Sequence, residues 1–443
     1  MFFGLACAAV LMQPDIMADT QTLHTQLEAD MLGMGRRART ASLALAAAGP
    51  TRRTEGLRQM AARVRAASET ILGANAEDMR LGRERSLSSA LLDRLALSQA
   101  RVEAIASGLE AVAALPDPVG RELARWTVPS GLDIARVATP LGVIGIIYES
   151  RPNVTADAGA LCVRSGNAAI LRGGSESTHS SGAIAMALRE GLRAAGLPED
   201  AVQLVATTDR AAVGHMLAGL GGQLDVLVPR GGKSLVTRVQ QEARVPVIGH
   251  LEGLCHTYVD ASADLEKAVS ICLNAKMRRI GICGAMETLL VDHAAVERLL
   301  PPIAGALVAA GCELRGDGAA REWVEGMKAA APEDWRTEYL APVLSVAIVE
   351  GVEGAIGHIA RYSSGHTEAI IAEDMAVAER FLSEVDAGIV MHNASSQFAD
   401  GGEFGMGAEI GIATGRIHAR GPVGADQLTI FKYVVRGTGQ TRP

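Results

Sequence analysis

One cysteine of this chain lies in a setting that favours nucleophilic chemistry. Cys283 belongs to the segment RRIGICGAM, in which Arg278 and Arg279 precede it and Gly281 and Gly284 lie close on either side. Nearby cations lower the pKa of a thiol, and glycines leave the surrounding backbone N–H groups accessible. A lowered pKa and accessible N–H groups are what a thiolate needs in order to attack a carbonyl carbon and hold the acyl group. The alternative, open for any cysteine of an apolar chain, is a small buried side chain without reactivity.

The other cysteines are weaker candidates. Cys255 is the rival nucleophile because His256 follows it, but adjacent residues of a strand face opposite ways and that histidine is poorly placed as its base. We expect Cys162 and Cys272 to be buried in helices and Cys312 to be structural. Six cysteines without a CxxC pair argue against a disulfide framework and a structural zinc site, and they favour a reducing compartment.

Two glycine-rich turns follow aliphatic runs and open helical stretches. The first consists of Arg172, Gly173, Gly174 and Ser175, and the second contains Arg230, Gly231, Gly232 and Lys233. Each offers backbone N–H groups and an adjacent cation, which suits the phosphates of a nucleotide. The second turn lacks the upstream glycine of a Walker loop, so an ATPase is disfavoured. Each turn alone is also compatible with a purely structural role, but the pair favours a cofactor.

The elements that position these residues alternate between aliphatic runs and helical stretches. After a helical opening over 23–115, predicted strands occur at 142–148, 168–172, 202–206, 225–229 and 245–249, and again at 256–260, 287–291, 342–349, 368–372 and 388–393. Strands separated by helices of this length indicate parallel sheets. We therefore predict two α/β domains in series, with a hairpin around Ser130 and Gly131 and an edge strand at 428–435 that needs a partner.

Composition excludes several classes of protein. The chain has 443 residues, 48% of them hydrophobic and 3% aromatic, and a formal net charge of -8. An acidic chain whose basic residues are scattered lacks the basic patch that nucleic-acid binding requires, so a nucleic-acid-binding protein is not expected. The apolar segment 1–12 lacks a basic flank and is too short to span a bilayer, so we expect neither secretion nor membrane insertion. The expected location is the cytoplasm.

Long segments of the chain closely resemble the gamma-glutamyl phosphate reductases of the aldehyde dehydrogenase superfamily. They are 140–177, VPRGGKSLV at 228–236, NAKMRRIGICGAMETLLV at 274–291, RYSSGHTEAI at 361–370 and 401–424. The resemblance implies an aldehyde dehydrogenase-like α/β fold with two Rossmann-like domains and a small β flap. It also implies NADPH-dependent, reversible reduction of L-glutamyl 5-phosphate to glutamate 5-semialdehyde and phosphate in proline biosynthesis.

The resemblance also assigns roles to individual residues. Cys283 matches the acylated thiol, Asn153 the amide of the oxyanion hole, and Glu338 the carboxylate that binds the nicotinamide ribose. The two glycine-rich turns match the NADP site, where Arg172 beside Ser175 favours the 2′-phosphate. Further candidates for binding the substrate or its phosphate are Arg151, Arg278, Arg279, His366 and Asn393. No metal ligand is expected.

Domain boundaries and partners follow from the same resemblance. We expect a disordered extension at 1–30, an NADP-binding domain at 31–125 and 140–254, a catalytic domain at 255–418, and an oligomerisation flap at 126–139 and 419–443. The flap implies a homodimer or homotetramer, and a labile acyl phosphate makes glutamate 5-kinase a candidate partner. Two alternatives stay open: a hydrolytic aldehyde dehydrogenase of the same fold, and a non-catalytic nucleotide-binding partner of that kinase. Glu252 lies in the region that corresponds to the base of hydrolytic relatives, and as an exposed loop carboxylate it is expected to have no catalytic role.

Overall fold

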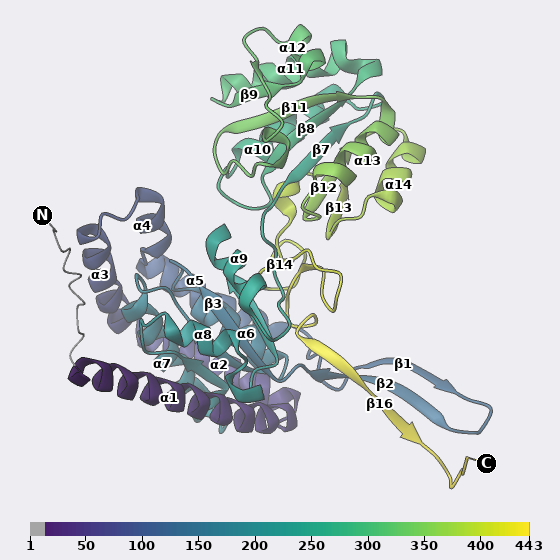
Figure 1. The fold of residues 1–443 in the computed structure, drawn as a ribbon. Helices are drawn as coiled ribbons and strands as arrows, with labels where there is room; N and C mark the ends of the chain where they lie inside the picture. The colour runs from purple at the N-terminus through teal and green to yellow at the C-terminus, as the bar shows by residue number, and fades with distance from the viewer. Residues whose placement is uncertain (1–13, 443) are drawn as a thin grey trace, which may run out of the picture.

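The computed structural model describes residues 14–442 (Figure 1). Helix α1 (Pro14–Ala47) begins the described chain. Of the extension expected at 1–30, residues 14–30 continue in one helix with the stretch to Ala47, and residues 1–13 lie outside the described part. The helix ends where Gly49 adopts a φ of 76°, and Pro50, whose φ is preset for a first turn, begins the next helix.

A helical layer precedes the first sheet, as the 23–115 pattern predicted. It consists of α1, α2 (Pro50–Ala66), α3 (Ser68–Glu84), α4 (Ser89–Leu95) and α5 (Gln99–Ala114). Ser88 and Ser98 cap α4 and α5 through their hydroxyl oxygens, which accept N–H groups of the first turn. Fully buried Leu57, Met60 and Leu109 join these helices to the core of the first sheet.

The first sheet is parallel, with strand order β5-β4-β3-β6. Its strands are β3 (Val143–Tyr148), β4 (Ala168–Arg172), β5 (Val202–Leu204) and β6 (Val226–Arg230). The helical segments between and after them are α6 (Val154–Arg164), α7 (Thr178–Ala194), η1 (Glu199–Ala201), α8 (Ala211–Leu217), η2 (Leu220–Gly222) and α9 (Lys233–Glu242). The fifth predicted strand, at 245–249, is wrong. Only an isolated bridge between Leu227 and Val247 forms there, because Pro246 has no N–H to continue a ladder.

The second sheet is also parallel and has the order β10-β9-β11-β8-β7-β12-β13. The predicted strands are found as β7 (Cys255–Val259), β8 (Met286–Asp292), β11 (Val343–Val349), β12 (Thr367–Ile371) and β13 (Ile389–His392). Sequence reasoning missed β9 (Glu313–Gly316) and β10 (Lys328–Ala329), which are short and contain no aliphatic run.

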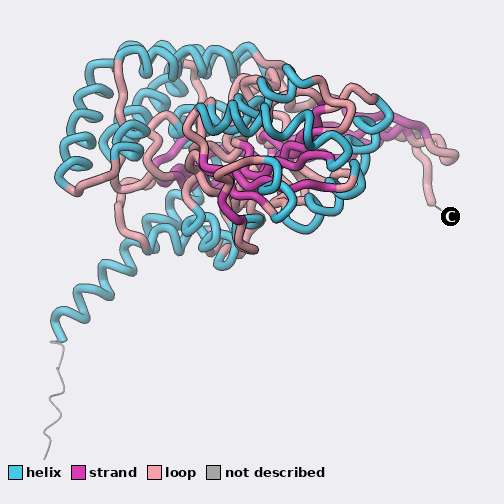
Figure 2. The backbone as a smooth tube through the Cα atoms, turned by 90° about the horizontal axis from the view of Figure 1, so that it is seen from above, coloured by secondary structure: helices cyan, strands magenta, loops and turns pink. Residues whose placement is uncertain are grey.

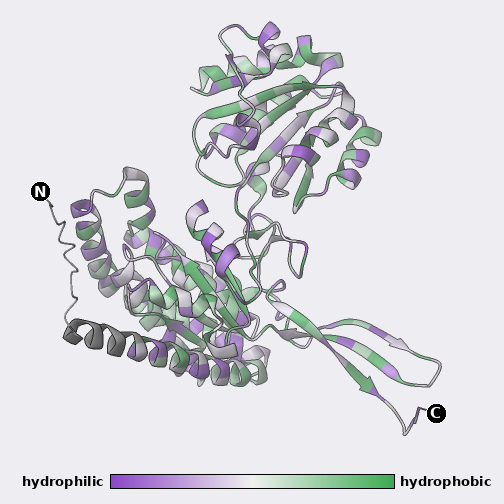
Figure 3. Ribbon diagram, in the orientation of Figure 1, coloured by the Kyte–Doolittle hydropathy of each residue, from purple (hydrophilic) through white to green (hydrophobic). Residues whose placement is uncertain are grey.

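Helices cover both faces of the strands, as Figure 2 shows. In the second α/β unit they are α10 (Leu265–Met277), η3 (His293–Ala295), α11 (Val296–Ala309), α12 (Gly318–Trp323), η4 (Asp334–Arg336), α13 (Gly351–Tyr362), α14 (Met375–Glu384) and η5 (Ser396–Phe398). Apolar residues of β7, β8 and β11 are buried between these layers, and Figure 3 shows the corresponding hydrophobic strands. No helix in the described part of the chain is long and apolar enough to cross a membrane.

A three-stranded antiparallel sheet projects from the two α/β units (Figure 1). Its order is β1-β2-β16, with β1 (Glu122–Thr127), β2 (Asp133–Pro140) and β16 (Thr429–Arg436). The predicted hairpin and the predicted C-terminal strand are thus parts of one element. A small pair, β14 (Ile412–Ala413) and β15 (Gly421–Pro422), lies on the path of the chain back to this sheet.

Candidate active site

Cys283 lies in the loop between α10 and β8, at the amino ends of the second sheet's central strands. The thiol residue is partly exposed, unlike the other four cysteines that the structure describes, which are buried. The backbone of Gly253 packs so closely that a Cβ on it would lie 2.1 Å from the carbonyl oxygen of Cys283. Only glycine fits at 253, so this contact fixes the loop that carries the thiol.

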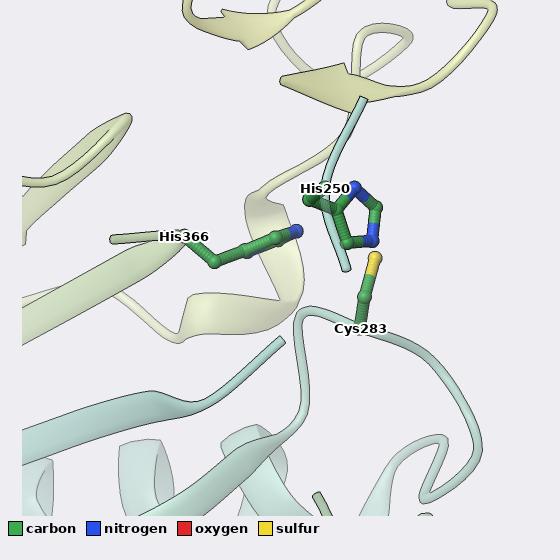
Figure 4. A group of neighbouring side chains, drawn as sticks. All are labelled: His250, Cys283 and His366. Atoms are coloured by element: carbon green, nitrogen blue, oxygen red, sulfur yellow. The ribbon is translucent and has the colours of Figure 1, made fainter. Parts of the chain in front are cut away.

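Two imidazole rings lie beside this thiol (Figure 4). His250 follows α9, His366 directly precedes β12, and their ring centroids are 4.8 Å apart in an edge-to-face arrangement. The Nδ1 of His250 is 2.6 Å from the carbonyl oxygen of Ile412. Burial lowers the pKa of His250, so the ring is neutral at pH 7. His366 is among the candidates predicted from the sequence, whereas no role was predicted for His250.

The rival thiol is not reactive. Cys255 is fully buried, its Sγ donates to the carbonyl oxygen of Cys283 at 3.1 Å, and burial raises its pKa well above the usual range. His256 points elsewhere, with its Nδ1 2.9 Å from the carboxylate of Glu368. The predicted burial of Cys162 and Cys272 is confirmed, and Cys312, which was predicted to be structural, is buried as well.

Arginines from both α/β units surround the thiol. Arg151 is partly buried, and burial together with the positive charges of Arg230, Arg94 and Arg279 lowers its pKa to about 10, while Cys283 opposes this shift. The guanidinium remains charged at pH 7. Sequence reasoning missed Arg94, whose Nη2 is 4.0 Å from the position of a Cβ on Gly281. No motif marks Arg94, because the fold alone brings α4 to the loop before β8.

The two cations that precede the thiol are both exposed. The Nη1 of Arg278 lies 3.4 Å from the Oε1 of Gln397 in η5, and the amide nitrogen of Gln397 donates to the carbonyl oxygen of Arg279. Just before them, the fully buried Lys276 forms an ion pair with Glu287, which ties the end of α10 to β8. The loop of Cys283 is therefore anchored at both ends.

Asn153 directly precedes α6, and its side chain makes no capping hydrogen bond. Its Nδ2 donates to the Oδ2 of Asp157 at 2.9 Å, and burial raises the pKa of Asp157 to about 6. One amide hydrogen is used in this bond, which leaves the other free to donate. The assignment of Asn153 to the oxyanion hole stays a prediction.

Two acidic residues of the predicted site hold neighbouring groups. The Oε1 of Glu338 accepts the N–H of Gly253 at 3.0 Å, and burial raises the pKa of Glu338. Glu338 therefore lies next to the contact that fixes the thiol loop. Glu252 forms an ion pair with Lys233 of the second glycine-rich turn, so it is not a free base in this structure.

Both glycine-rich turns lie at the carboxyl ends of strands of the first sheet, as predicted. Arg172 is buried and donates to the carbonyl oxygens of Gly173 and Thr208, so its guanidinium is already engaged. Burial, together with the positive charge of the exposed Arg210, lowers the pKa of Arg172, and no role was predicted for Arg210 from the sequence. Ser175 is exposed on the same turn.

A carboxylate lies against the backbone at each of the two turns. The N–H of Gly232 donates to Glu149 at 2.9 Å, and Arg230 lies 3.8 Å from Glu409. A Cβ on Gly174 would lie 2.1 Å from Glu176, and one on Gly231 would lie 2.4 Å from Glu149. Glycine at 174 and 231 therefore lets these carboxylate side chains pack directly against the backbone of each turn.

Asn393 does not lie near the thiol. It follows the carboxyl end of β13. There its Oδ1 accepts the N–H of Ala372, and its Nδ2 donates to the carbonyl oxygen of Ala372. Cys283 and His366 lie at the amino ends of parallel strands, so the length of the sheet separates them from Asn393. A role of Asn393 in binding substrate stays a prediction, and this position at the opposite end of the strand gives it no support.

Comparison with known proteins decides the family. The model of the aldehyde dehydrogenase family matches residues 17–310 and 330–413. The chain is 67% identical over 413 residues to a gamma-glutamyl phosphate reductase of Hyphomonas neptunium, covering 93% of this chain and 96% of that protein. The chain belongs to the gamma-glutamyl phosphate reductases of the aldehyde dehydrogenase family.

Other members of this reductase family agree. A gamma-glutamyl phosphate reductase of Caulobacter vibrioides is 64% identical over 413 residues, covering 93% of this chain and all of that protein. The crystal structure of a gamma-glutamyl phosphate reductase from Thermotoga maritima has a TM-score of 0.91 and 43% identity, covering 93% of this chain and all of that one. The predicted fold class and the predicted enzyme family are confirmed.

Proposed function

We propose that this chain reduces L-glutamyl 5-phosphate with NADPH through a thioester on Cys283. The observation that carries the proposal is the partly exposed thiol with the positive charges of Arg151, Arg94 and Arg279 close to it. Cations at this position attract an anionic acyl phosphate. The names of the relatives in the reductase family support the same substrate.

The residues of the chain account for the acyl transfer. The Cys283 thiolate forms a bond to the carbonyl carbon of the substrate, negative charge develops on the carbonyl oxygen, and the Asn153 amide stabilises it. The carbon–oxygen bond to phosphate then breaks, and phosphate leaves toward the arginines. A thioester on Cys283 remains. Water needs no activation in this step, which fits the pairing of Glu252 with Lys233 and disfavours the hydrolytic alternative.

The glycine-rich turns fit a dinucleotide. At Gly174 and Gly231 a side chain would meet a neighbouring carboxylate, and the N–H of Gly232 binds a carboxylate in this structure, so it is able to bind an anion. Gly173, Gly174, Ser175, Gly231 and Gly232 would hold NADPH, with Glu338 at its ribose. When bound, NADPH supplies the hydride that reduces the thioester carbonyl. The resulting thiohemiacetal releases the aldehyde as its carbon–sulfur bond breaks and Cys283 regains the thiol.

The requirement for phosphate tests this function in the reverse direction. We expect NADPH to form from glutamate 5-semialdehyde and NADP only when inorganic phosphate is present, since phosphate must cleave the thioester. The Cys283→Ser variant should lose at least about 1,000-fold in kcat. Cys272→Ala, a buried thiol on α10, is the matched control and should retain activity. Equal wild-type rates with and without phosphate would show a hydrolytic enzyme instead.

A further inference from the structure

The thiol of Cys283 and two neighbouring imidazoles are side chains that can bind a transition-metal ion. Ligand atoms of Cys283, His250 and His366 all lie within 4.8 Å of one another. Figure 4 shows that the three side chains come from three separate segments and converge on one point. One thiolate and two imidazoles are the ligands that a borderline-soft divalent cation such as Zn²⁺ prefers.

The orientation of His250 is already that of a metal ligand. Its Nδ1 lies 2.6 Å from the carbonyl oxygen of Ile412, which accepts a hydrogen bond and cannot donate one. The proton is therefore on Nδ1, and Nε2 carries a free lone pair. Histidines that bind metals are usually held in this way, by a hydrogen bond from the second ring nitrogen to a carbonyl or carboxylate.

His366 supplies an independent observation. The residue is fully buried, and its Nε2 has no hydrogen-bond partner within the described residues. The other ring nitrogen, Nδ1, lies 2.9 Å from the hydroxyl of Thr367 and 3.6 Å from the Sγ of Cys255. Buried polar atoms nearly always have a partner, so an unpartnered nitrogen beside a thiol needs an explanation. A cation bound between His366 and Cys283 provides that partner.

We propose that Cys283, His250 and His366 bind one Zn²⁺-like cation, with a fourth position open to water on the exposed side of the thiol. Ligand atoms around tetrahedral zinc are about 3.5 Å apart, so rotation of these side chains has to bring them about 1 Å closer. Binding forms a metal–sulfur bond and releases the thiol proton to solvent. The cation occupies the lone pair of the nucleophile and therefore inhibits turnover reversibly. This inhibition rests on the proposed function, but the binding does not.

Cobalt is the probe for the site itself. The full-length protein, freed of metal with a chelator, is titrated with Co²⁺ in the absence of substrate and NADPH. We expect one Co²⁺ per chain with a sulfur-to-cobalt charge-transfer band and the visible bands of four-coordinate cobalt, and we expect Zn²⁺ to displace it. Cys283→Ser should abolish the charge-transfer band. His366→Gln and His250→Gln should each weaken Co²⁺ binding by at least about tenfold.

Two thiol variants serve as controls. Cys255→Ala and Cys272→Ala should both keep the band, since neither thiol belongs to the set. The proposal is overturned if no charge-transfer band forms, if the band survives Cys283→Ser, or if it disappears only with Cys255→Ala. Zn²⁺ inhibition of NADPH-dependent turnover, reversed by chelator, tests the consequence. A band without inhibition would confirm the metal site and contradict the role of Cys283 as the nucleophile.

Discussion

At the scale of single residues, Arg94 is a candidate phosphate-binding residue that the fold reveals and the sequence does not. Its guanidinium reaches the loop of Cys283 from α4 and adds positive charge where the substrate phosphate would leave. We predict that Arg94→Ala raises the KM for glutamyl phosphate by about tenfold, the effect of losing one charge-assisted contact. Steady-state kinetics at constant ionic strength measure this change.

The control for Arg94 is Arg80→Ala. Arg80 lies on neighbouring α3 and pairs with Glu77 and Glu84 on the surface. Its loss should leave the KM for glutamyl phosphate unchanged, and the KM for NADPH should stay constant in both variants. An Arg94→Ala enzyme with unaltered kinetics would remove Arg94 from the phosphate site.

At the scale of elements, a partly buried histidine couples the stability of the second α/β unit to pH. His358 of α13 packs against Trp335, Tyr362 and His256, with ring centroids 4.7–5.6 Å away. Burial lowers its pKa to about 3. Above pH 6.5 the ring is neutral in folded and unfolded chains alike, so it has no effect. As pH falls below 6.5, only the unfolded chain takes up the proton and stability is lost.

This loss has a definite size. At pH 5 the unfolded chain gains about 2 kcal/mol from protonation of His358, at about 1.4 kcal/mol per pH unit below 6.5. We predict that His358→Phe, which keeps the ring contacts, removes this part of the decline between pH 7 and pH 5 in urea unfolding. His293→Asn, on the exposed η3, is the control and should decline like the wild type. An unchanged decline in His358→Phe would contradict the prediction.

Elements with strong aliphatic runs were the ones that sequence reasoning placed well. The segments of β3, β4, β8 and β12 are fully buried on both faces, and such strands read as continuous hydrophobic runs. β9, with the sequence ELRG, gives no such signal. The run at 245–249 gives it falsely, because Pro246 interrupts the ladder.

The candidate site was predictable only where a motif is local. Cys283 and the glycine-rich turns have a signature in neighbouring residues. Arg94 and His250 come close to the loop before β8 only because the fold brings distant segments together, and no local sequence pattern predicts this proximity. The rule that ligands bind at the carboxyl ends of parallel strands holds for the predicted site residues of only one of the two sheets. The turns lie at the carboxyl ends of the first sheet, whereas the thiol lies at the amino ends of the second.

At the scale of the whole molecule, the projecting sheet has open edges and exposed aromatic side chains that a single chain does not cover. β1 and β16 are both edge strands, and exposed aromatic side chains gather on them. Trp126 and Phe431 each contact Tyr433 edge to face, at centroid distances of 6.1 and 5.6 Å. Aromatic side chains on an open edge are typical of an interface. We therefore propose that copies of this chain assemble through this sheet, as the predicted homo-oligomer requires.

Substitution of the most exposed of these rings tests the assembly. Tyr433 is 57% exposed in the single chain. We predict that Tyr433→Asp weakens self-association by about 2 kcal/mol, or about thirtyfold in Kd, since it removes an aromatic anchor and places a charge in an apolar contact. Light scattering after size-exclusion chromatography, over a dilution series, should show a smaller species. Met186→Asp, at an equally exposed apolar residue of α7, should leave the mass unchanged. If the two variants behave alike, the sheet is not the surface through which the chains associate.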